Sequence, residues 1–230
     1  MTTAVILAGG LGTRLRSAVP DLPKPMAPID GRPFLEYQLD YWVMQGVSRF
    51  ILSVGYRYEV IVEHFGSSYK GANIDYVIEK NPLGTGGGLL LASEKIVKGE
   101  PFLLLNGDTY FAVDLKELVK FSSVNKADWC FSLFRTSEEG RYMGMDVSPS
   151  GKIVSLKSGK GHLANGGVYW VKSSSVLHDV PQDKNLSLED DIFPDALVSG
   201  QDLFGIEFES TFIDIGVPDD YYRSSIVLTQ

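Results

Sequence analysis

Glycine, arginine and lysine gather near the start of the chain in a pattern that suits an anion. The segment AVILAGGLGTRL, residues 4–15, runs from an apolar stretch into Gly9, Gly10 and Gly12 and then reaches Arg14. Glycines let backbone N–H groups close around phosphate oxygens, a following helix N-terminus would add to the attraction, and arginine supplies a forked donor for the same anion. The segment predicts a phosphate-binding loop.

A second segment, PKPMAPI at residues 23–29, holds Lys24 between two prolines. The prolines restrain the backbone on either side, so the root of a long flexible side chain stays in one place. A lysine aimed at a phosphate gains from this restraint, whereas a surface lysine gains little. The glycine loop fits neither a dinucleotide fingerprint, whose third glycine is missing at the right spacing, nor a Walker loop, because no GK[ST] follows.

Composition excludes several other functions. The 230 residues carry 21 Lys and Arg against 29 Asp and Glu, a net charge of −8, which argues against a nucleic-acid partner. No apolar run approaches the ~18 residues of a membrane span, and the N-terminus lacks the basic segment of a signal peptide. We therefore expect no membrane partner and a cytoplasmic location. Cys130 stands alone, which excludes an internal disulfide, and with no histidine near it in the sequence it reads as a buried strand residue rather than a nucleophile.

The elements that must position these residues alternate between short apolar runs and amphipathic stretches. This pattern predicts an α/β fold with a Rossmann-like mixed, mostly parallel sheet and helices on both faces, in a single domain over residues 1–230 with a more β-rich second half. Strands are expected at residues 3–8, 49–55, 73–79, 101–108, 128–135, 145–148, 152–157, 166–171 and 212–216. Helices are expected at residues 34–46, 58–66, 86–97 and 188–200, and from Pro218 onward.

The two N-terminal segments together resemble the signature of the sugar-phosphate nucleotidylyltransferases, the family that makes nucleotide sugars. EKNPLGTGGG at residues 79–88, NGGVY at 165–169 and FIDIGVPDDYY at 212–222 extend the resemblance over residues 1–222. These motifs are most similar to the branch of heptose 1-phosphate guanylyltransferases. The resemblance implies the nucleotide-diphospho-sugar transferase fold and transfer of GMP from GTP to a sugar 1-phosphate, D-glycero-α-D-manno-heptose 1-phosphate, with release of pyrophosphate.

The resemblance also implies a metal site and a set of substrate contacts. Asp108, after a buried strand, and Asp214, in the DIG segment, would hold Mg²⁺, which takes one or two carboxylates together with phosphate oxygens and water. Arg14 and Lys24 are the implied catalytic residues. The implied nucleotide contacts are Leu7, Ala8, Gly9, Gly10, Gly12, Thr13, Glu79, Pro82, Gly84, Thr85, Asn106 and Gly107. The implied sugar-phosphate contacts are Asn165, Gly166, Lys157 and Lys160. The partners are thus GTP and a sugar 1-phosphate, and a homodimer is common in such families.

Glu79 carries the expected choice of base. Guanine presents two adjacent donors, and a carboxylate has two acceptors at matching separation, whereas thymine and uracil would meet it with a carbonyl oxygen. Because Glu79 stands where the family reads its base, we expect GTP to be preferred over UTP and TTP. The competing interpretation is a solvated carboxylate beside Lys80.

Two departures from the family pattern leave the sugar open. Ser158 and Gly159 stand where relatives commonly have a Glu-Lys pair, so Lys157 or Lys160 would have to hold the sugar phosphate. The common RYG becomes RYM at residues 141–143. The alternatives are a mannose 1-phosphate guanylyltransferase and a uridylyl- or thymidylyltransferase. A catalytically silent nucleotide sensor and an NAD-linked oxidoreductase fit poorly, because the first would have lost Lys24 or an acid and the second lacks its fingerprint.

Overall fold

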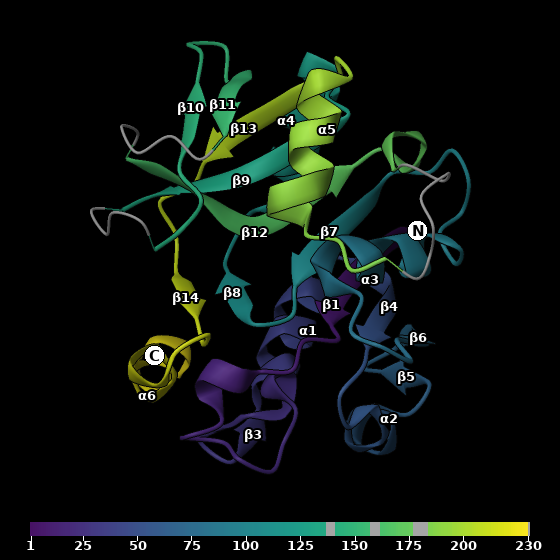
Figure 1. Cartoon of the computed structure of the whole chain (residues 1–230), viewed down its shortest axis with the longest axis vertical. Coiled ribbons are helices and arrows are strands. Elements are labelled where there is room, and N and C mark those ends of the chain that lie inside the picture. The colour runs from purple at the N-terminus through teal and green to yellow at the C-terminus, as the bar shows by residue number, and fades with distance from the viewer. Residues whose placement is uncertain (137–140, 157–161, 177–183, 230) are drawn as a thin grey trace.

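A computed structural model of the chain describes residues 1–136, 141–156, 162–176 and 184–229, and an eight-stranded sheet forms its centre (Figure 1). The strand order is β13-β9-β12-β7-β1-β4-β6-β5. These strands are β1 (Thr2–Ala8), β4 (Val47–Val54), β5 (Ser68–Tyr69), β6 (Ala72–Ile78), β7 (Phe102–Asn106), β9 (Trp129–Arg135), β12 (Leu163–Val171) and β13 (Leu203–Glu207). Short two-stranded pairs are formed by β2 (Pro28–Ile29) with β3 (Arg32–Pro33), β8 (Thr109–Phe111) with β14 (Phe212–Asp214), and β10 (Met145–Val147) with β11 (Ile153–Leu156).

The sheet is mixed, and its parallel part sets the position of the site. β1 pairs in parallel with both β4 and β7, β4 with β6, and β13 with β9, whereas β12 runs antiparallel to β7 and β9 and β5 runs antiparallel to β6. From β1 the chain first builds β4 and β6 on one side and then returns to place β7 on the other. The carboxyl ends of β1 and β7 thus form a topological switch point, where open α/β sheets bind ligands.

Helices cover both faces of the sheet. Apolar residues of α1 (Phe34–Met44), α2 (Tyr58–Phe65) and α4 (Leu115–Asn125) pack in one core, and those of α3 (Gly84–Ser93) and α5 (Phe193–Val198) pack in the other. A third, smaller core joins residues 15–34 to β14 and the final helix, α6 (Pro218–Leu228). These observations confirm the predicted α/β class with helices on both faces. No helix among the described parts of the chain is both long and apolar enough to cross a membrane.

Most expected elements are present, and the differences have local causes. The helix expected at 86–97 spans Gly84–Ser93, because the chain turns through hydrogen bonds from Lys95 N to Ala92 O and from Ile96 N to Ser93 O. The helix expected at 188–200 begins as a π-turn at Leu188–Ile192 before α5, whose second residue is a proline without an N–H to donate.

Two elements of more than three residues were not expected from the sequence. The first is α4, although Asp114 accepts a hydrogen bond from Glu117 N at 3.0 Å, the geometry of an N-cap with a detectable D-x-x-E signal. The second is the edge strand β13, a five-residue run interrupted by Gly205. The segment of α4 has apolar residues at helical spacing, Leu115, Leu118 and Val119, so it could have been predicted, whereas β13 is too short for a clear apolar period.

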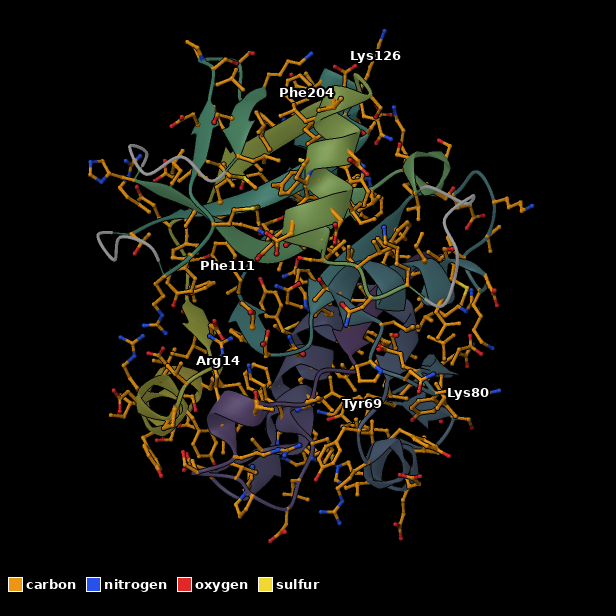
Figure 2. All side chains as sticks on the ribbon, viewed as in Figure 1. Arg14, Tyr69, Lys80, Phe111, Lys126 and Phe204 are labelled. Carbon is orange, nitrogen blue, oxygen red and sulfur yellow. The ribbon has the colours of Figure 1, made fainter. Side chains whose placement is uncertain are left out.

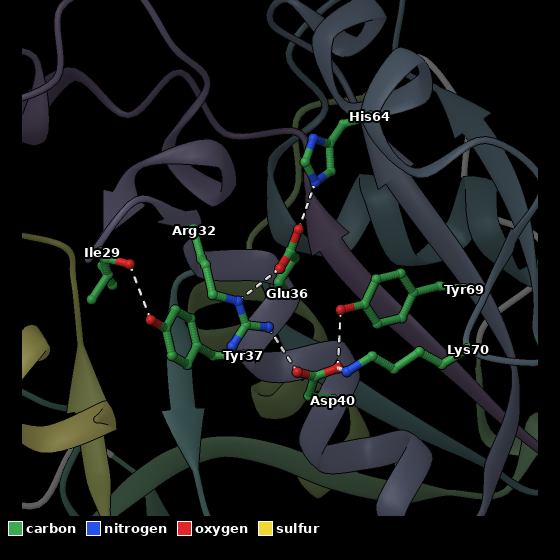
Figure 3. A network of polar contacts seen from close by, with 8 residues as sticks. All are labelled: Ile29, Arg32, Glu36, Tyr37, Asp40, His64, Tyr69 and Lys70. Carbon is green, nitrogen blue, oxygen red and sulfur yellow. Dashed lines mark hydrogen bonds and ion pairs between the residues drawn. The ribbon is translucent and has the colours of Figure 1, made fainter. Parts of the chain in front are cut away.

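A polar network ties α1 to α2 and β5 on the outside of this framework (Figure 3). Arg32 Nε contacts Glu36 Oε2 at 2.9 Å and its terminal nitrogen contacts Asp40 Oδ2 at 2.7 Å. Lys70 Nζ lies 2.5 Å from Asp40 Oδ1, and His64 Nε2 lies 2.7 Å from Glu36 Oε1. We call these five residues the surface network.

Candidate active site

A pocket of about 820 Å³ opens at the carboxyl ends of β1 and β7. Its lining contains every expected site residue that the structure describes: Leu7, Ala8, Gly9, Gly10, Gly12, Thr13, Arg14, Lys24, Glu79, Pro82, Gly84, Thr85, Asn106, Gly107, Asp108, Asn165, Gly166 and Asp214. Lys157 and Lys160 lie outside the described residues. The motifs therefore converge on one cavity, although segments from both ends of the chain contribute to it.

The three glycines of the first loop serve three different purposes. A Cβ on Gly9 would lie 2.0 Å from Glu79 Oε1, so this glycine makes room for a side chain. A Cβ on Gly10 would meet nothing within 4 Å, so the backbone there faces open space that a ligand can approach. Gly12 has a φ of 59°, a left-handed conformation that favours glycine.

No α-helix begins directly after this loop. The chain makes a single 3₁₀ turn at Thr13–Leu15 and then continues through residues rich in proline, which cannot donate helical hydrogen bonds. A helix dipole therefore adds little here, and the cations carry the positive charge. The exposed Arg14 lies on the same side of the molecule as β14 and α6 (Figure 2).

Lys24 is held as its flanking prolines predict. Pro23 is extended, with φ −64° and ψ 144°, and Lys24 starts a 3₁₀ turn closed by hydrogen bonds from Met26 N to Pro23 O at 2.8 Å and from Ala27 N to Lys24 O at 3.0 Å. The lysine side chain is only 10% exposed, and its Nζ lies 2.5 Å from Asp108 Oδ2. The ammonium group thus sits at the carboxylates of the pocket.

Strand pairing brings Asp214 to Asp108. In the β8–β14 pair, Asp214 stands opposite Thr109, the residue after Asp108, and Ile215 N donates to Asp108 O at 2.9 Å. On the other side, the buried Gln38 of α1 donates from Nε2 to the carbonyls of Asn106, at 2.8 Å, and of Thr109. The loop that carries Asp108 is therefore fixed from both sides.

The pKa values of the two carboxyl groups are shifted in opposite directions. Burial would raise the pKa of Asp108, but the adjacent Lys24 ammonium lowers it below its ordinary value. The pKa of Asp214 is raised, by burial and by the negative charge of Asp108, against partial compensation from Lys24, the Gly216 amide and Arg14. Two carboxylates this close disfavour joint ionisation unless further positive charge is added.

These residues fit a hard divalent cation. Both donors are carboxylate oxygens, the ligand type that such cations prefer, and the unfavourable charge on Asp214 is of the sign that a cation relieves. No group of three or more His, Cys, Asp or Glu side chains within the described ranges could hold a metal ion. A cation bound by this pair would thus keep coordination positions for phosphate oxygens and water.

Glu79 follows β6 and is fixed under the glycine loop. Its Oε1 accepts a hydrogen bond from the buried Ser53 Oγ at 3.0 Å, and its Oε2 accepts one from Leu83 N at 3.3 Å. Burial raises the pKa of this carboxyl, and the Leu83 amide and Ser53 hydroxyl oppose the rise. Because each carboxylate oxygen can accept more than one hydrogen bond, both retain capacity toward the pocket.

The first turn of α3 is hydrogen-bonded to residues 186 and 188, a segment distant in the sequence. The amides of Gly86 and Gly87 donate to Leu186 O at 2.7 and 3.3 Å, and Thr85 Oγ1 accepts from Leu188 N at 2.9 Å. A Cβ on Gly86 would lie 3.0 Å from Leu186 Cβ, so the glycine run permits this close approach. Residues 184–188 thus form one wall of the pocket.

The NGG motif forms a bulge in β12. The register of β12 against β9 shifts between Asn165 and Tyr169, and Gly167 has a φ of 72°. A Cβ on Gly166 would lie 2.5 Å from two ring carbons of Phe111, so no larger residue fits there. Asn165 Nδ2 donates to Tyr169 Oη at 2.7 Å, which fixes both side chains at the pocket wall.

Several lining residues escaped sequence reasoning. Arg141, noted only as part of the altered RYM segment, lines the pocket and forms an ion pair with Asp220 of α6. Tyr169 lay inside a quoted motif without a role. The others are Leu11, Pro25, Thr109, Tyr142, Met143, Gly167, Asn185, Ser187, Leu188, Glu189, Phe212, Gly216 and Val217. Glu189 lies in SLEDD, which carries no local signal other than the N-capping Ser187.

Comparison with known proteins agrees with this geometry. The family model described as "Nucleotidyl transferase" matches residues 3–230. A D-glycero-α-D-manno-heptose 1-phosphate guanylyltransferase of Campylobacter jejuni is 40% identical over 223 residues, covering 96% of this chain and 97% of the relative. A mannose-1-phosphate guanylyltransferase of Mycobacterium tuberculosis is 33% identical, and the match covers 99% of this chain but 64% of that protein.

A solved structure is similar over the whole fold. The crystal structure of HddC from Yersinia pseudotuberculosis complexed with GMP-PN matches with a TM-score of 0.84 and 35% identity, covering 98% of this chain and 99% of that one. Sequence, fold and the convergence of the motifs on one pocket agree. The chain belongs to the nucleotidyl transferase family.

Proposed function

We propose that the protein transfers GMP from GTP to D-glycero-α-D-manno-heptose 1-phosphate and releases pyrophosphate. The observation that carries this proposal is the pocket itself, which joins the glycine loop, the Asp108–Asp214 pair and Glu79 in one cavity. Support comes from the relative of that name, at 40% identity over nearly the full length of both chains. The similar structure bound to GMP-PN agrees with a guanine nucleotide as ligand.

The reaction needs positioning and charge neutralisation more than proton transfer. A phosphate oxygen of the sugar 1-phosphate attacks the α-phosphorus of GTP, the bond to the bridging oxygen breaks, and pyrophosphate leaves with the electron pair. In our proposal the loop at Gly9–Thr13 and the Arg14 guanidinium hold the triphosphate. The Lys24 ammonium screens the repulsion between the α-phosphate and the incoming phosphate.

Asp108 and Asp214 would hold Mg²⁺. The ion would supply Lewis-acid polarisation of the reacting phosphate oxygens. The strand pairing keeps both carboxylates on one side of the pocket, and Gly216 N, which donates to Asp214 Oδ1 at 2.6 Å, orients the second carboxylate. Gly216 must be small, because a Cβ there would lie 2.8 Å from that oxygen and 3.2 Å from Lys24 Nζ.

Glu79 would select guanine. The Ser53 hydroxyl and the Leu83 amide hold its carboxylate in one orientation, and the two oxygens can accept from N1–H and the exocyclic amino group together. A similar bidentate contact discriminates bases by about 1–3 kcal/mol in nucleic-acid recognition. Replacing Glu79 by Gln should thus reduce kcat/KM for GTP about tenfold or more and leave UTP unchanged or improved.

The test is a pyrophosphate-release screen of four NTPs against several sugar 1-phosphates. The proposal expects the highest kcat/KM for GTP with the heptose 1-phosphate. Higher activity with mannose 1-phosphate would favour the function of the 33% identical relative. A preference for UTP or TTP would contradict the guanylyltransferase assignment altogether.

The same screen applied to Glu79→Gln tests the choice of base. The matched control is Glu63→Gln on the exposed face of α2, which removes one charge outside the pocket lining. Loss of all NTPs in equal measure would show that Glu79 does not choose the base. The cytoplasmic location, the homodimer and the single domain stay predictions.

A further inference from the structure

Four acidic side chains line the pocket, and the proposed reaction uses three of them. Glu79, Asp108 and Asp214 have roles toward the base and the metal; Glu189 has none. Glu189 is exposed and lines the wall of the pocket. A carboxylate repels a phosphate group but accepts hydrogen bonds from neutral donors, and hydroxyl groups are donors of this kind.

The position of Glu189 is fixed by its backbone. It belongs to the π-turn at Leu188–Ile192, where Ser187 Oγ accepts from Glu189 N and Asp190 N, both at 3.1 Å. Asp191 closes the cap by accepting from Ser187 N at 2.8 Å. The same turn is held to the start of α3 through the hydrogen bond from Leu188 N to Thr85.

Glu189 lines the same pocket as Tyr169, Asn165 and Gly166. Burial raises the pKa of the Tyr169 phenol, and the charge of Glu189 and then that of Asp108 raise it further. Asn165, which donates to the Tyr169 hydroxyl, belongs to the NGG bulge of the same wall. Glu189 and the NGG bulge thus belong to the walls of one pocket.

We propose that Glu189 accepts hydrogen bonds from ring hydroxyls of the sugar 1-phosphate and is a specificity-determining residue. The inference rests on the proposed function. A carboxylate offers two oxygens to neighbouring hydroxyl donors, and a bound sugar presents such pairs. The sequence has Ser158 where relatives commonly have a glutamate, and Glu189 supplies a carboxylate from the wall beside α3.

The test compares Glu189→Gln with Asp190→Asn, its neighbour on the same turn outside the pocket lining. For Glu189→Gln, KM for the sugar 1-phosphate should rise about tenfold or more, since hydrogen bonds to charged groups contribute about 1.5–3 kcal/mol. KM for GTP should stay within about twofold, and the melting temperature should equal that of Asp190→Asn. Asp190→Asn should keep wild-type values of KM and kcat.

Sugar 1-phosphates lacking single hydroxyl groups identify the contact. In the wild type, one deoxy analogue should have a kcat/KM about tenfold below that of the parent sugar. In Glu189→Gln, the same analogue and the parent sugar should have nearly equal values of kcat/KM. An equal loss in both proteins would overturn the inference, as would a Glu189→Gln variant whose KM for the sugar is unchanged. Failure of the proposed function is separate, because wild-type protein would then lack guanylyltransferase activity with every sugar tested.

Discussion

The surface network and the Asp108–Asp214 pair each contain two carboxylates, yet the surrounding charges affect these carboxylates in opposite ways. In the network, burial would raise the pKa of Glu36 and of Asp40, but bonds from His64 and Arg32 lower the first and bonds from Lys70, Arg32 and Tyr69 lower the second. In the pocket, Lys24 lowers the pKa of Asp108, while that of Asp214 is raised. In the network, the pKa values of both carboxyl groups are lowered, so their charges are balanced without a ligand. In the pocket, the pKa of Asp214 stays raised, so negative charge is left for a ligand to balance. The difference teaches that the charge a fold leaves unbalanced marks the place where a ligand must supply the balance.

The largest effect is expected from removing one carboxylate of the Asp108–Asp214 pair. Asp214→Asn keeps the shape of the side chain and removes its charge, so turnover with Mg²⁺ should fall by about a hundredfold or more. Without metal, the melting temperature should hold or rise, because the substitution removes the repulsion from Asp108. Steady-state kinetics and a melting curve in EDTA check both. Near-wild-type turnover would contradict the two-carboxylate metal site.

Lys24→Met removes the ion pair between Lys24 and Asp108 in the pocket. We expect kcat to fall by about a hundredfold, because the ammonium opposes phosphate charge in the transition state. The melting temperature should fall by only a few degrees, at about 2–4 °C per kcal/mol for a chain of this size. A large loss of melting temperature with little change in kcat would make this lysine structural.

Asp40→Asn breaks the surface network and should have the opposite profile. It removes contacts to Arg32 and Lys70, so the free energy of unfolding should fall by about 1–2 kcal/mol at neutral pH while kcat/KM stays unchanged. The folded-state pKa of Asp40 is lowered, so the unfolded state binds more protons between the two pKa values. The stabilisation is thus present above the unfolded pKa of about 3.9 and lost as the pH falls through the lower folded value.

Denaturant unfolding of wild type and Asp40→Asn from neutral to acidic pH measures this. The difference between the two curves should be constant above about pH 5 and shrink at lower pH. A difference that grows on acidification would reverse the sign of the argument.

The smallest expected effect concerns the edge of the network. His64 is 38% exposed in its side chain, and its contact with Glu36 Oε1 lies partly in solvent. His64→Ala should cost no more than about 0.5 kcal/mol and leave turnover unchanged. Urea unfolding compared with Asp40→Asn checks the order, and a larger loss for His64→Ala would show that the histidine, rather than Arg32, organises these carboxylates.

Site residues that lie beside a glycine, a proline or a strand end could be predicted from the sequence. Gly9, Gly10, Lys24 and Asp108 follow strand ends or sit between prolines, and parallel strands bring such ends to one edge of a sheet, so a single pocket was foreseeable. The 3₁₀ turn at Thr13–Leu15 that follows the first loop was not among the expected elements.

Contacts that depend on distant pairing could not be foreseen in the same way. The placement of Asp214 beside Asp108 depends on the register of β8 and β14, and the resemblance supplied it rather than any local pattern. Glu189 and Arg141 reach the pocket through the packing of residues 184–188 on α3 and through the ion pair with Asp220 of α6. Such contacts join segments that are up to about a hundred residues apart in the chain. The local pattern of either segment does not identify the segment that it contacts.

The pairing of β8 with β14 also sets an order in time. A growing chain presents the glycine loop, Lys24 and Asp108 well before Asp214 has been synthesised. At about 5–20 residues per second, the ribosome takes roughly 5–20 s to travel from the first carboxylate to the second. During that interval the nascent chain has the phosphate loop but only one of the two carboxylates. The proposed reaction can therefore begin only after β14 has paired with β8. The strand that is synthesised last thus completes the metal site.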